Sequence, residues 1–422
     1  MKVKSLLLSM CAIAALASCS QNDDEIPGGE SNAPEAKVII KLTGTGERAS
    51  SRASGIPSEL DTKNGKVNNL TVFIFNKDGV VITKKYIGTP ASAEANSVST
   101  TTDATEVAVI ANTGDLTGAG QLFATVSTKT ALKAVLTDIL ETPDTPAGGI
   151  TQKDANLYMS GIGNLDPFVK KDETMQASVT IPLHFLAARI QLTKITFNGG
   201  SVKDNKYVQN NDFAKTDDAN FTITRVYLMS VQRMTQFLPT TDAGADYIAQ
   251  NQKKYTGGVA WTAPWAAPAP TDFKQYDEYN IEAAADKFVE GTATAQNSIS
   301  DIGHWYTFTN DGVSDIANHP TVLVVEMKWR KTMATSDPKA DAVNETKYFA
   351  TYFGGGDKDE LKAGQTYSVV LNLNGNFKPE NQGGSGGGGT TDPTKPTVNS
   401  SVNVTVTAAK WANPINIEKS WL

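Results

Sequence analysis

The chain has 422 residues, of which 40% are hydrophobic and 20% are charged, and its formal net charge is -7. This length is long for a single hydrophobic core and predicts two domains. The acidic balance, spread without long charged runs, argues against nucleic acid as a partner. The only cysteines, Cys11 and Cys19, lie near the N-terminus, so we expect stability from burial and strand pairing and not from internal disulfides.

Residues 1–18 read MKVKSLLLSMCAIAALAS, in which lysines precede an apolar run. The run is too short to span a bilayer as a mature helix, and the pattern predicts an export signal. Leu16-Ala17-Ser18-Cys19 resembles a bacterial lipobox, which predicts acylation of Cys19, with palmitate as the expected lipid. The alternative is an ordinary signal peptide with an incidental cysteine. The polar tether SQNDDEIPGGESNAPEA that follows favours the lipid anchor.

A short apolar strand is predicted next, over residues 37–42, with Val38, Ile40 and Leu42 on one face. Arg48 and Arg52 follow in a small, Ser/Ala/Gly-rich stretch. Stretches of this kind are where a protease can draw a chain into its active site. The alternative is that both are ordinary surface arginines in a loop.

From Val67 onward, strand-like runs alternate with turns rich in Gly, Asn, Asp and Pro, which predicts an all-β fold. Asn76-Lys77-Asp78-Gly79 predicts a tight turn between two apolar runs. The one helix candidate covers residues 127–141, STKTALKAVLTDILE, with Ser127 as its cap. We expect this minor helix to cover a sheet.

The domain boundary is expected within the polar stretch 198–206. It gives two tandem β-sandwich-like (transthyretin-like) domains, residues 53–198 and residues 199–375. Residues 376–397 are rich in glycine and then proline, and we expect a linker that reaches beyond its own domain.

Residues 398–422 form a separate tail with the pattern of a strand. Val402, Val404 and Val406 alternate with Asn and Thr residues, as in a strand with one buried face. A single strand does not fold alone and needs a sheet edge. That edge belongs either to its own chain or to another molecule.

Catalytic and metal-binding patterns are not apparent in the sequence. His184, His304 and His319 are scattered, with no Glu or Cys at ligand spacing. Residues 383–387 match G-x-S-x-G, but a glycine tract lacks the strand-turn-helix context of a nucleophile elbow. We therefore expect no enzyme activity, no metal and no cofactor.

Aromatic residues offer one binding hypothesis. Trp261 with Trp265, and Trp305 with Tyr306, are candidates for a sugar-binding platform. Aromatic residues in a β domain are more often part of the core or cover a loop.

The order of these features resembles the major fimbrillins of Bacteroidia-type (type V) pili. The similar stretches are LTVFIFNKDG, EVAVIANTGDL, LYMSGIG, LHFLAARIQLTKI, HPTVLVVEMKW, KYFATYFGG, LKAGQTYSVVLNLNG and VNVTVTAAKW, with Trp421 near the end. The tract 383–389 departs from the family pattern in being richer in glycine.

The resemblance implies a stalk subunit of a surface fimbrium that supports adhesion and biofilm formation. Such a subunit is exported to the outer membrane as a lipoprotein, cut after an arginine by a trypsin-like protease, and polymerised by donor-strand exchange. It ends in the extracellular fimbrium. The partners implied are other copies in a head-to-tail polymer, anchor and tip subunits, an arginine-specific surface protease and a transient lipid anchor in the outer membrane.

Mapped onto this chain, the resemblance makes residues 19–52 a propeptide. The scissile residue is Arg52, because Arg52-Ala53-Ser54-Gly55 resembles the family's Arg-Ala-x-Gly, and Arg48 stays open as an alternative. The displaced strand carries Val38, Ile40 and Leu42, and the donor strand carries Val402, Val404, Val406 and Trp411.

Three other functions stay open. A fimbrial anchor should keep its lipidated N-terminus and a tip subunit should lack the tail, so the arginine loop and the tail together favour the stalk. A surface lipoprotein that binds glycans would use the tryptophans and keep the tail packed on its own body.

Overall fold

The structure is a computed structural model of the whole chain. It describes residues 33–43, 65–90, 96–139, 151–171, 173–198, 200–203, 206–209, 221–239, 255–256, 288–289, 297–310, 320–331, 343–353, 360–374, 402–405 and 415–421.

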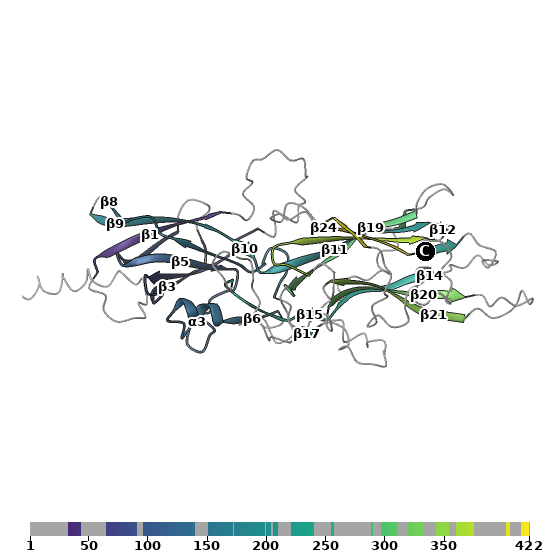
Figure 1. Cartoon of the computed structure of the whole chain (residues 1–422), viewed down its shortest axis with the longest axis horizontal. Coiled ribbons are helices and arrows are strands. Elements are labelled where there is room, and N and C mark those ends of the chain that lie inside the picture. Colours follow the sequence, from purple (N-terminus) through teal and green to yellow (C-terminus); the bar gives the residue numbers. More distant parts are fainter. Residues whose placement is uncertain are drawn as a thin grey trace, which may run out of the picture.

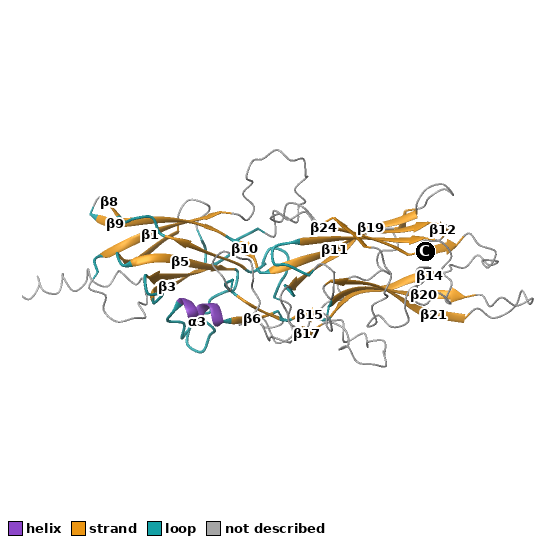
Figure 2. Ribbon diagram, in the orientation of Figure 1, coloured by secondary structure: helices purple, strands orange, loops and turns teal. Residues whose placement is uncertain are grey.

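The described residues are mostly β-strand with one short helix, as Figure 2 shows. Four large sheets form two pairs along an elongated molecule (Figure 1). We call the two sheets nearer the N-terminus, with the helix, the N-terminal half, and the other two the C-terminal half. The expectation of a β-rich fold with a minor helix is confirmed.

The N-terminal half contains two sheets. The first has the order β4-β1-β9-β8, formed by Asn96–Thr101, Glu35–Thr43, Thr174–Pro182 and Val169–Lys171. The second has the order β10-β7-β5-β2-β3, formed by His184–Phe185, Met159–Asn164, Ala104–Ala111, Leu70–Asn76 and Val81–Ile87. In Figure 1, β9 and β1 lie in the upper layer of this half and β3 in the lower layer.

The C-terminal half also contains two sheets. One has the order β18-β19-β11-β22-β24-β23, formed by Phe288–Val289, Asn297–Phe308, Ala187–Asn198, Thr366–Asn374, Ile415–Trp421 and Val402–Thr405. The other has the order β12-β13-β14-β20-β21, formed by Gly200–Lys203, Lys206–Gln209, Phe221–Met229, Thr321–Lys331 and Val343–Phe353.

Two small strand pairs complete the described fold. One joins β15 (Val231–Gln232) to β17 (Tyr255–Thr256), and the other joins β16 (Met234–Gln236) to β6 (Leu136–Asp138). The second pair connects the two halves, and it is reinforced by an ion pair in which Arg233 Nε lies 2.8 Å from a carboxylate oxygen of Asp138.

The helix is shorter than the sequence predicted. It covers only α3 (Lys129–Ala134), and its cap is Thr128, whose hydroxyl accepts from the Ala131 amide at 3.0 Å, and not Ser127. Val135 is already extended, and β6 follows at once. Pairing of β6 with β16 competes with the helical pattern, and this tertiary contact outweighs local propensity.

The predicted turn at residues 76–79 is confirmed. The Gly79 amide donates to the Asn76 carbonyl at 3.0 Å, and Gly79 has a φ of +73°. The Asn76 side-chain oxygen also accepts from the amides of Asp78 and Val80, each at 3.0 Å. Glycine adopts this left-handed conformation without steric cost, which is why the turn ends there.

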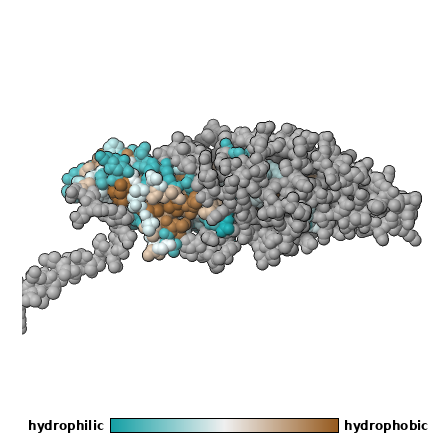
Figure 3. Space-filling model, turned by 60° about the horizontal axis from the view of Figure 1, so that its bottom comes forward, coloured by the Kyte–Doolittle hydropathy of each residue, from teal (hydrophilic) through white to brown (hydrophobic). Residues whose placement is uncertain are grey.

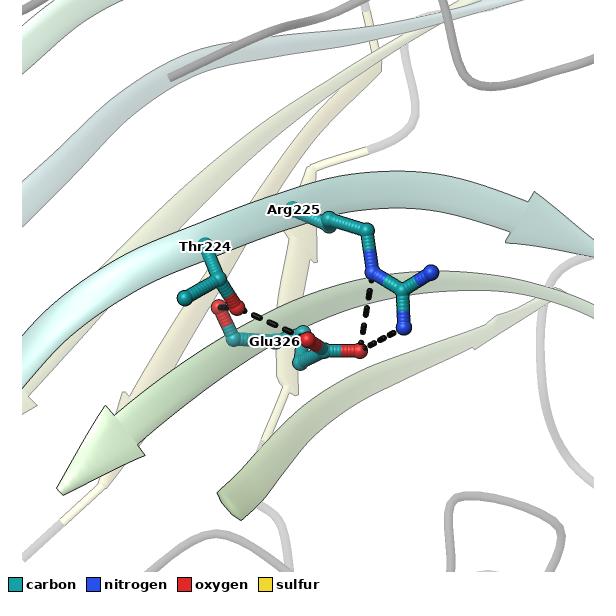
Figure 4. Close-up of polar contacts among 3 residues, drawn as sticks. All are labelled: Thr224, Arg225 and Glu326. Carbon is teal, nitrogen blue, oxygen red and sulfur yellow. Dashed lines mark hydrogen bonds and ion pairs between the residues drawn. The ribbon is translucent and has the colours of Figure 1, made fainter. Parts of the chain in front are cut away.

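A partly buried ion pair links two strands of the last sheet (Figure 4). Arg225 Nη2 of β14 donates to Glu326 Oε2 of β20 at 2.5 Å, and Thr224 donates to the other carboxylate oxygen at 2.8 Å. A register shift between Ile223 and Arg225 lets these neighbouring side chains reach one carboxylate. Burial, the largest single effect, disfavours the charged guanidinium. The hydrogen bond to Glu326 and the electrostatic attraction to Glu326 and two tyrosines together outweigh it, so the pKa of Arg225 is raised.

Most large hydrophobic side chains of the described residues are buried. Figure 3 shows hydrophobic patches among hydrophilic residues on one face of the N-terminal half. The exposed large hydrophobic side chains in the described ranges are Val80, Leu122 and Val169. Within those same ranges, no helix has the length and apolar character needed to cross a membrane.

Candidate functional site

The N-terminal strand β1 is an interior strand of its sheet. It pairs antiparallel with β4, in a register that sets Val38 opposite Val98. On its other side it pairs parallel with β9, where Val38 lies opposite Ala177 and Leu42 opposite Ile181. The strand therefore fills a gap between two strands that come from much later in the chain.

The inner face of β1 belongs to the hydrophobic core. Val38 and Ile40 are 0% and 1% exposed, whereas Lys37 and Lys41 on the opposite face are exposed. Leu42 is partly buried and packs against the same core. The alternation seen in the sequence thus corresponds to one buried and one exposed face.

The space between β4 and β9 that β1 fills is called the β1 slot below. Its inner lining includes Val98 of β4 and Ala177, Val179 and Ile181 of β9, all buried. The sequence analysis did not predict that β4 forms a wall of this site. The feature that could have predicted a half-buried strand here is the alternation in NSVSTT, where residues 96, 98 and 100 are buried and residues 97 and 99 are exposed.

The C-terminal strands lie on the C-terminal half, far along the chain from the β1 slot. β24 pairs parallel with β22, in a register from Tyr367↔Ile415 to Leu373↔Trp421. β23 pairs antiparallel with β24 and forms the outer edge of that sheet. Figure 1 shows β24 on the C-terminal half and β1 on the N-terminal half. In the single chain, the tail thus occupies an edge of its own molecule.

Several predicted site residues lie outside the described residues. They are Cys19, Arg48, Arg52, Val406 and Trp411. Val402 and Val404 lie in β23. Both arginines lie between the end of β1 and the start of β2, so a cut after either one would sever the connection of β1 to the rest of the chain without cutting a described strand.

One histidine contacts charged and aromatic neighbours between the halves. His304 Nε2 of β19 lies 3.1 Å from Asp154 Oδ1, and the Tyr306 hydroxyl donates to the same oxygen at 2.6 Å. The hydrogen bond to His304 is the largest effect and lowers the pKa of Asp154. Desolvation opposes it, but the hydrogen bond to Tyr306 adds to the lowering, and the pKa lies below its ordinary value. Among the described side chains, no group of His, Cys, Asp and Glu could hold a metal ion.

The second pair of aromatic residues proposed to bind a sugar is buried. Trp305 and Tyr306 are 3% and 6% exposed in β19 and belong to the core. The hypothesis that these two rings offer a face to a sugar is therefore wrong. Trp261 and Trp265 lie outside the described residues.

Comparisons with known families match two models. The model of the major fimbrial subunit protein (FimA) matches residues 36–207. The model of the FimA-like major fimbrial subunit protein, C-terminal domain, matches residues 268–411. No curated protein matches the chain.

Solved structures share the fold. A candidate cell adhesion protein from Bacteroides eggerthii is 26% identical, with a TM-score of 0.56, and the match covers 93% of this chain and 100% of that one. Two candidate cell adhesion proteins from Parabacteroides distasonis each have a TM-score of 0.50. One is 17% identical, over 81% of this chain and 89% of that one, and the other is 13% identical, over 92% and 99%.

Proposed function

The chain belongs to the FimA-like major fimbrial subunit family, and on that premise we propose that it is a stalk subunit that polymerises by donor-strand exchange. Members are structural subunits of cell-surface fimbriae and not enzymes. The observation that carries the proposal is the position of β1, an N-terminal strand in the interior of a sheet, with both arginines following it before β2.

The first steps are export and processing. The precursor is lipidated on Cys19 at the outer membrane, and an arginine-specific protease then cuts after Arg52, or after Arg48. The cut separates residues 19–52 from the mature subunit. Because β1 is then held by non-covalent contacts alone, it can be replaced.

The second step is strand exchange. Loss of β1 leaves unpaired N–H and C=O groups on β4 and β9 and exposes the apolar lining, and such an edge accepts a strand. The tail of another copy supplies Val402, Val404, Val406 and Trp411. Burial of these side chains would contribute roughly 6 to 12 kcal/mol before ordering costs, and each ladder hydrogen bond about 1 kcal/mol.

The tail must leave the edge of β22 before it can be donated. We interpret the described pairing of β24 with β22 as the resting position of the tail in the monomer. Because the slot and the tail belong to opposite halves, a tail donated to the slot of the next copy makes a head-to-tail contact that does not close on itself, and this generates a filament.

The two halves are proposed to be two transthyretin-like sandwich domains. The boundary is best set at Leu186, because β11 pairs with β19 and β22 of the C-terminal half and precedes the boundary expected at Asn198. Residues 376–397 serve as the linker to the donor segment. Its length allows the tail to reach a neighbouring subunit.

A surface lipoprotein that does not polymerise is the second candidate. The observation that favours it is the tail on the edge of its own sheet. Limited trypsin treatment of the lipid-free precursor separates the two functions. The stalk function predicts SDS-resistant ladders, which deletion of residues 401–422 abolishes.

A matched pair of substitutions sharpens this experiment. Val404→Asp places a charge on the predicted buried face of the donor strand and should abolish the ladders. Asn403→Asp adds the same charge on the other face and should leave them. Ladders that persist in the deletion variant would show that the tail is not the donor.

A further inference from the structure

We infer that the β1 slot is a pre-formed strand acceptor, whose walls β4 and β9 stay one strand apart after β1 leaves because each is fastened separately to the opposite sheet. The slot would take an extended segment with alternating apolar residues. The inference rests on the proposed function only for the source of that segment, a second copy of this chain.

Two glycines of β7 allow β9 to pack directly against the opposite sheet. A Cβ atom at Gly161 of β7 would lie 2.3 Å from the carbonyl oxygen of Pro182 and 2.6 Å from Ile181 Cγ2. At Gly163 an added Cβ would lie 2.9 Å from Val179 Cγ2. Only glycine permits so close an approach between β7 and β9. The contacts involve β9 and not β1, so they persist when β1 is gone.

Two hydrogen bonds in the middle of β9 add to this attachment. The Asp166 amide, just after β7, donates to the Ser178 carbonyl at 2.9 Å, and the Ser178 hydroxyl donates to the Asp166 carboxylate at 2.5 Å. Beyond the end of β9 the chain crosses to the opposite sheet, where β10 pairs with β7. The β9 wall is therefore attached to the opposite sheet from Ser178 to its end at Pro182.

The β4 wall has its own attachments. The chain passes from β4 to β5 of the opposite sheet through residues 102 and 103 alone. The Thr83 hydroxyl of β3 donates to Thr100 Oγ1 at 3.0 Å, and both side chains are buried. None of these contacts involves β1, so the second wall is also independent of it.

Closure of the slot would require the walls to approach each other by about 4.8 Å, the spacing between paired strands. The attachments of β4 and β9 oppose that movement. The slot would then stay open, with unpaired backbone groups on both sides, and an incoming strand would not need to force the sheets apart. Pre-organisation of this kind lowers the cost of binding.

Hydrogen exchange on the cleaved protein tests the inference. The N-terminal fragment is removed in mild denaturant, and the protein is returned to buffer. We expect the β4 and β9 amides that faced β1 to exchange at least about tenfold faster, while β2 and β5 keep their protection. A peptide of residues 33–43 should restore the protection of β4 and β9. Persistent protection of both walls without peptide, or loss of protection in β2 and β5, would overturn the inference.

Variants test the attachments. Gly161→Ala should weaken binding of the 33–43 peptide at least about tenfold, because β9 must move away from β7. Gly118→Ala is the matched control, since its added Cβ comes no closer than 3.9 Å to Gln121 Cγ. Thr83→Val removes the hydroxyl at nearly constant volume and should also weaken binding if Gly161→Ala does not fold. Unchanged affinity in a folded Gly161→Ala or Thr83→Val variant would contradict the role of that attachment.

A second peptide separates this inference from the proposed function. Residues 398–422 should compete with residues 33–43 for the slot. If the 33–43 peptide binds an open slot and the tail peptide does not, the slot inference stands and the donor role of the tail is wrong.

Discussion

Phe237 packs against Phe123, with ring centroids 5.1 Å apart and planes at 66°. Phe123 in turn contacts Phe73 of β2 edge-on at 5.3 Å. Phe237 follows β16, which comes after β14 of the C-terminal half, yet it completes the core of the N-terminal half. Buried residues of both halves belong to one continuous cluster. We therefore expect the halves to behave as one cooperative unit.

Phe237→Ala should lower the free energy of unfolding by about 3–5 kcal/mol, because it leaves a cavity in a fully buried site. Unfolding of the wild-type protein in denaturant, followed by fluorescence and circular dichroism, should give coincident transitions. Val169→Ala is the control, since Val169 is 62% exposed and its loss should change little. Two separate transitions in the wild type would contradict the shared core.

Ile40→Ala should weaken the hold of the slot on β1. The side chain is 1% exposed, and the substitution should cost about 2–5 kcal/mol. After cleavage, the variant should lose its N-terminal fragment faster and form ladders sooner than the wild type. Glu35→Ala, on an exposed residue at the start of the same strand, should match the wild type in a time course on SDS gels. Equal rates for the Ile40 variant would mean that departure of β1 does not limit assembly.

Asp154→Asn should make the free energy of unfolding less dependent on pH in the acid range. The pKa of Asp154 is lowered in the folded protein, so its stabilising contribution is complete above its ordinary value of 3.8 and is lost as the pH falls through the lowered pKa. The carboxylate is partly exposed, and we expect a difference below about 1 kcal/mol. Thermal unfolding from pH 7 to pH 2 should show the two proteins converging at low pH. A difference in melting temperature between the two proteins that grows towards low pH would contradict the lowered pKa of Asp154.

Glu326→Gln should destabilise the C-terminal half by about 1–3 kcal/mol, since it removes the charge that pairs with the partly buried Arg225. A double-mutant cycle with Arg225→Met isolates the pairwise energy. We expect the double variant to be less destabilised than the sum of the single variants. Strict additivity would show that the ion pair contributes nothing of its own.

Local patterns predicted the elements that depend on a single stretch of chain. The alternation around Val38 predicted β1, and the turn at Gly79 follows from its need for a positive φ. The helix failed beyond Ala134 because residues 136–138 pair with residues 234–236, a partner that no local pattern reveals. The boundary proposed at Leu186 likewise depends on the pairing of β11 with β19, which no local pattern reveals.

The candidate site was predictable only in part. The sequence identified the strand that fills the slot. The walls are residues 96–101 and 174–182, and no local pattern shows that these two strands lie on either side of β1, because that depends on the topology of the sheet. Gly161 and Gly163 lie in the stretch LYMSGIG, yet their role depends on how closely β9 approaches. The burial of Trp305 likewise depends on tertiary packing and not on its neighbours in sequence.

The central claim is that the β1 slot of one copy receives the tail of another. Cysteine cross-linking tests it most directly. One lipid-free preparation carries Ser97→Cys on β4, a second carries a cysteine at Asn403, Thr405 or Thr407, and Cys19 is replaced in both. After mixing and limited trypsin treatment, we predict disulfide-linked dimers that contain one copy of each, and none before cleavage. Absence of mixed dimers at all three tail positions, with SDS-resistant ladders still forming, would contradict the account.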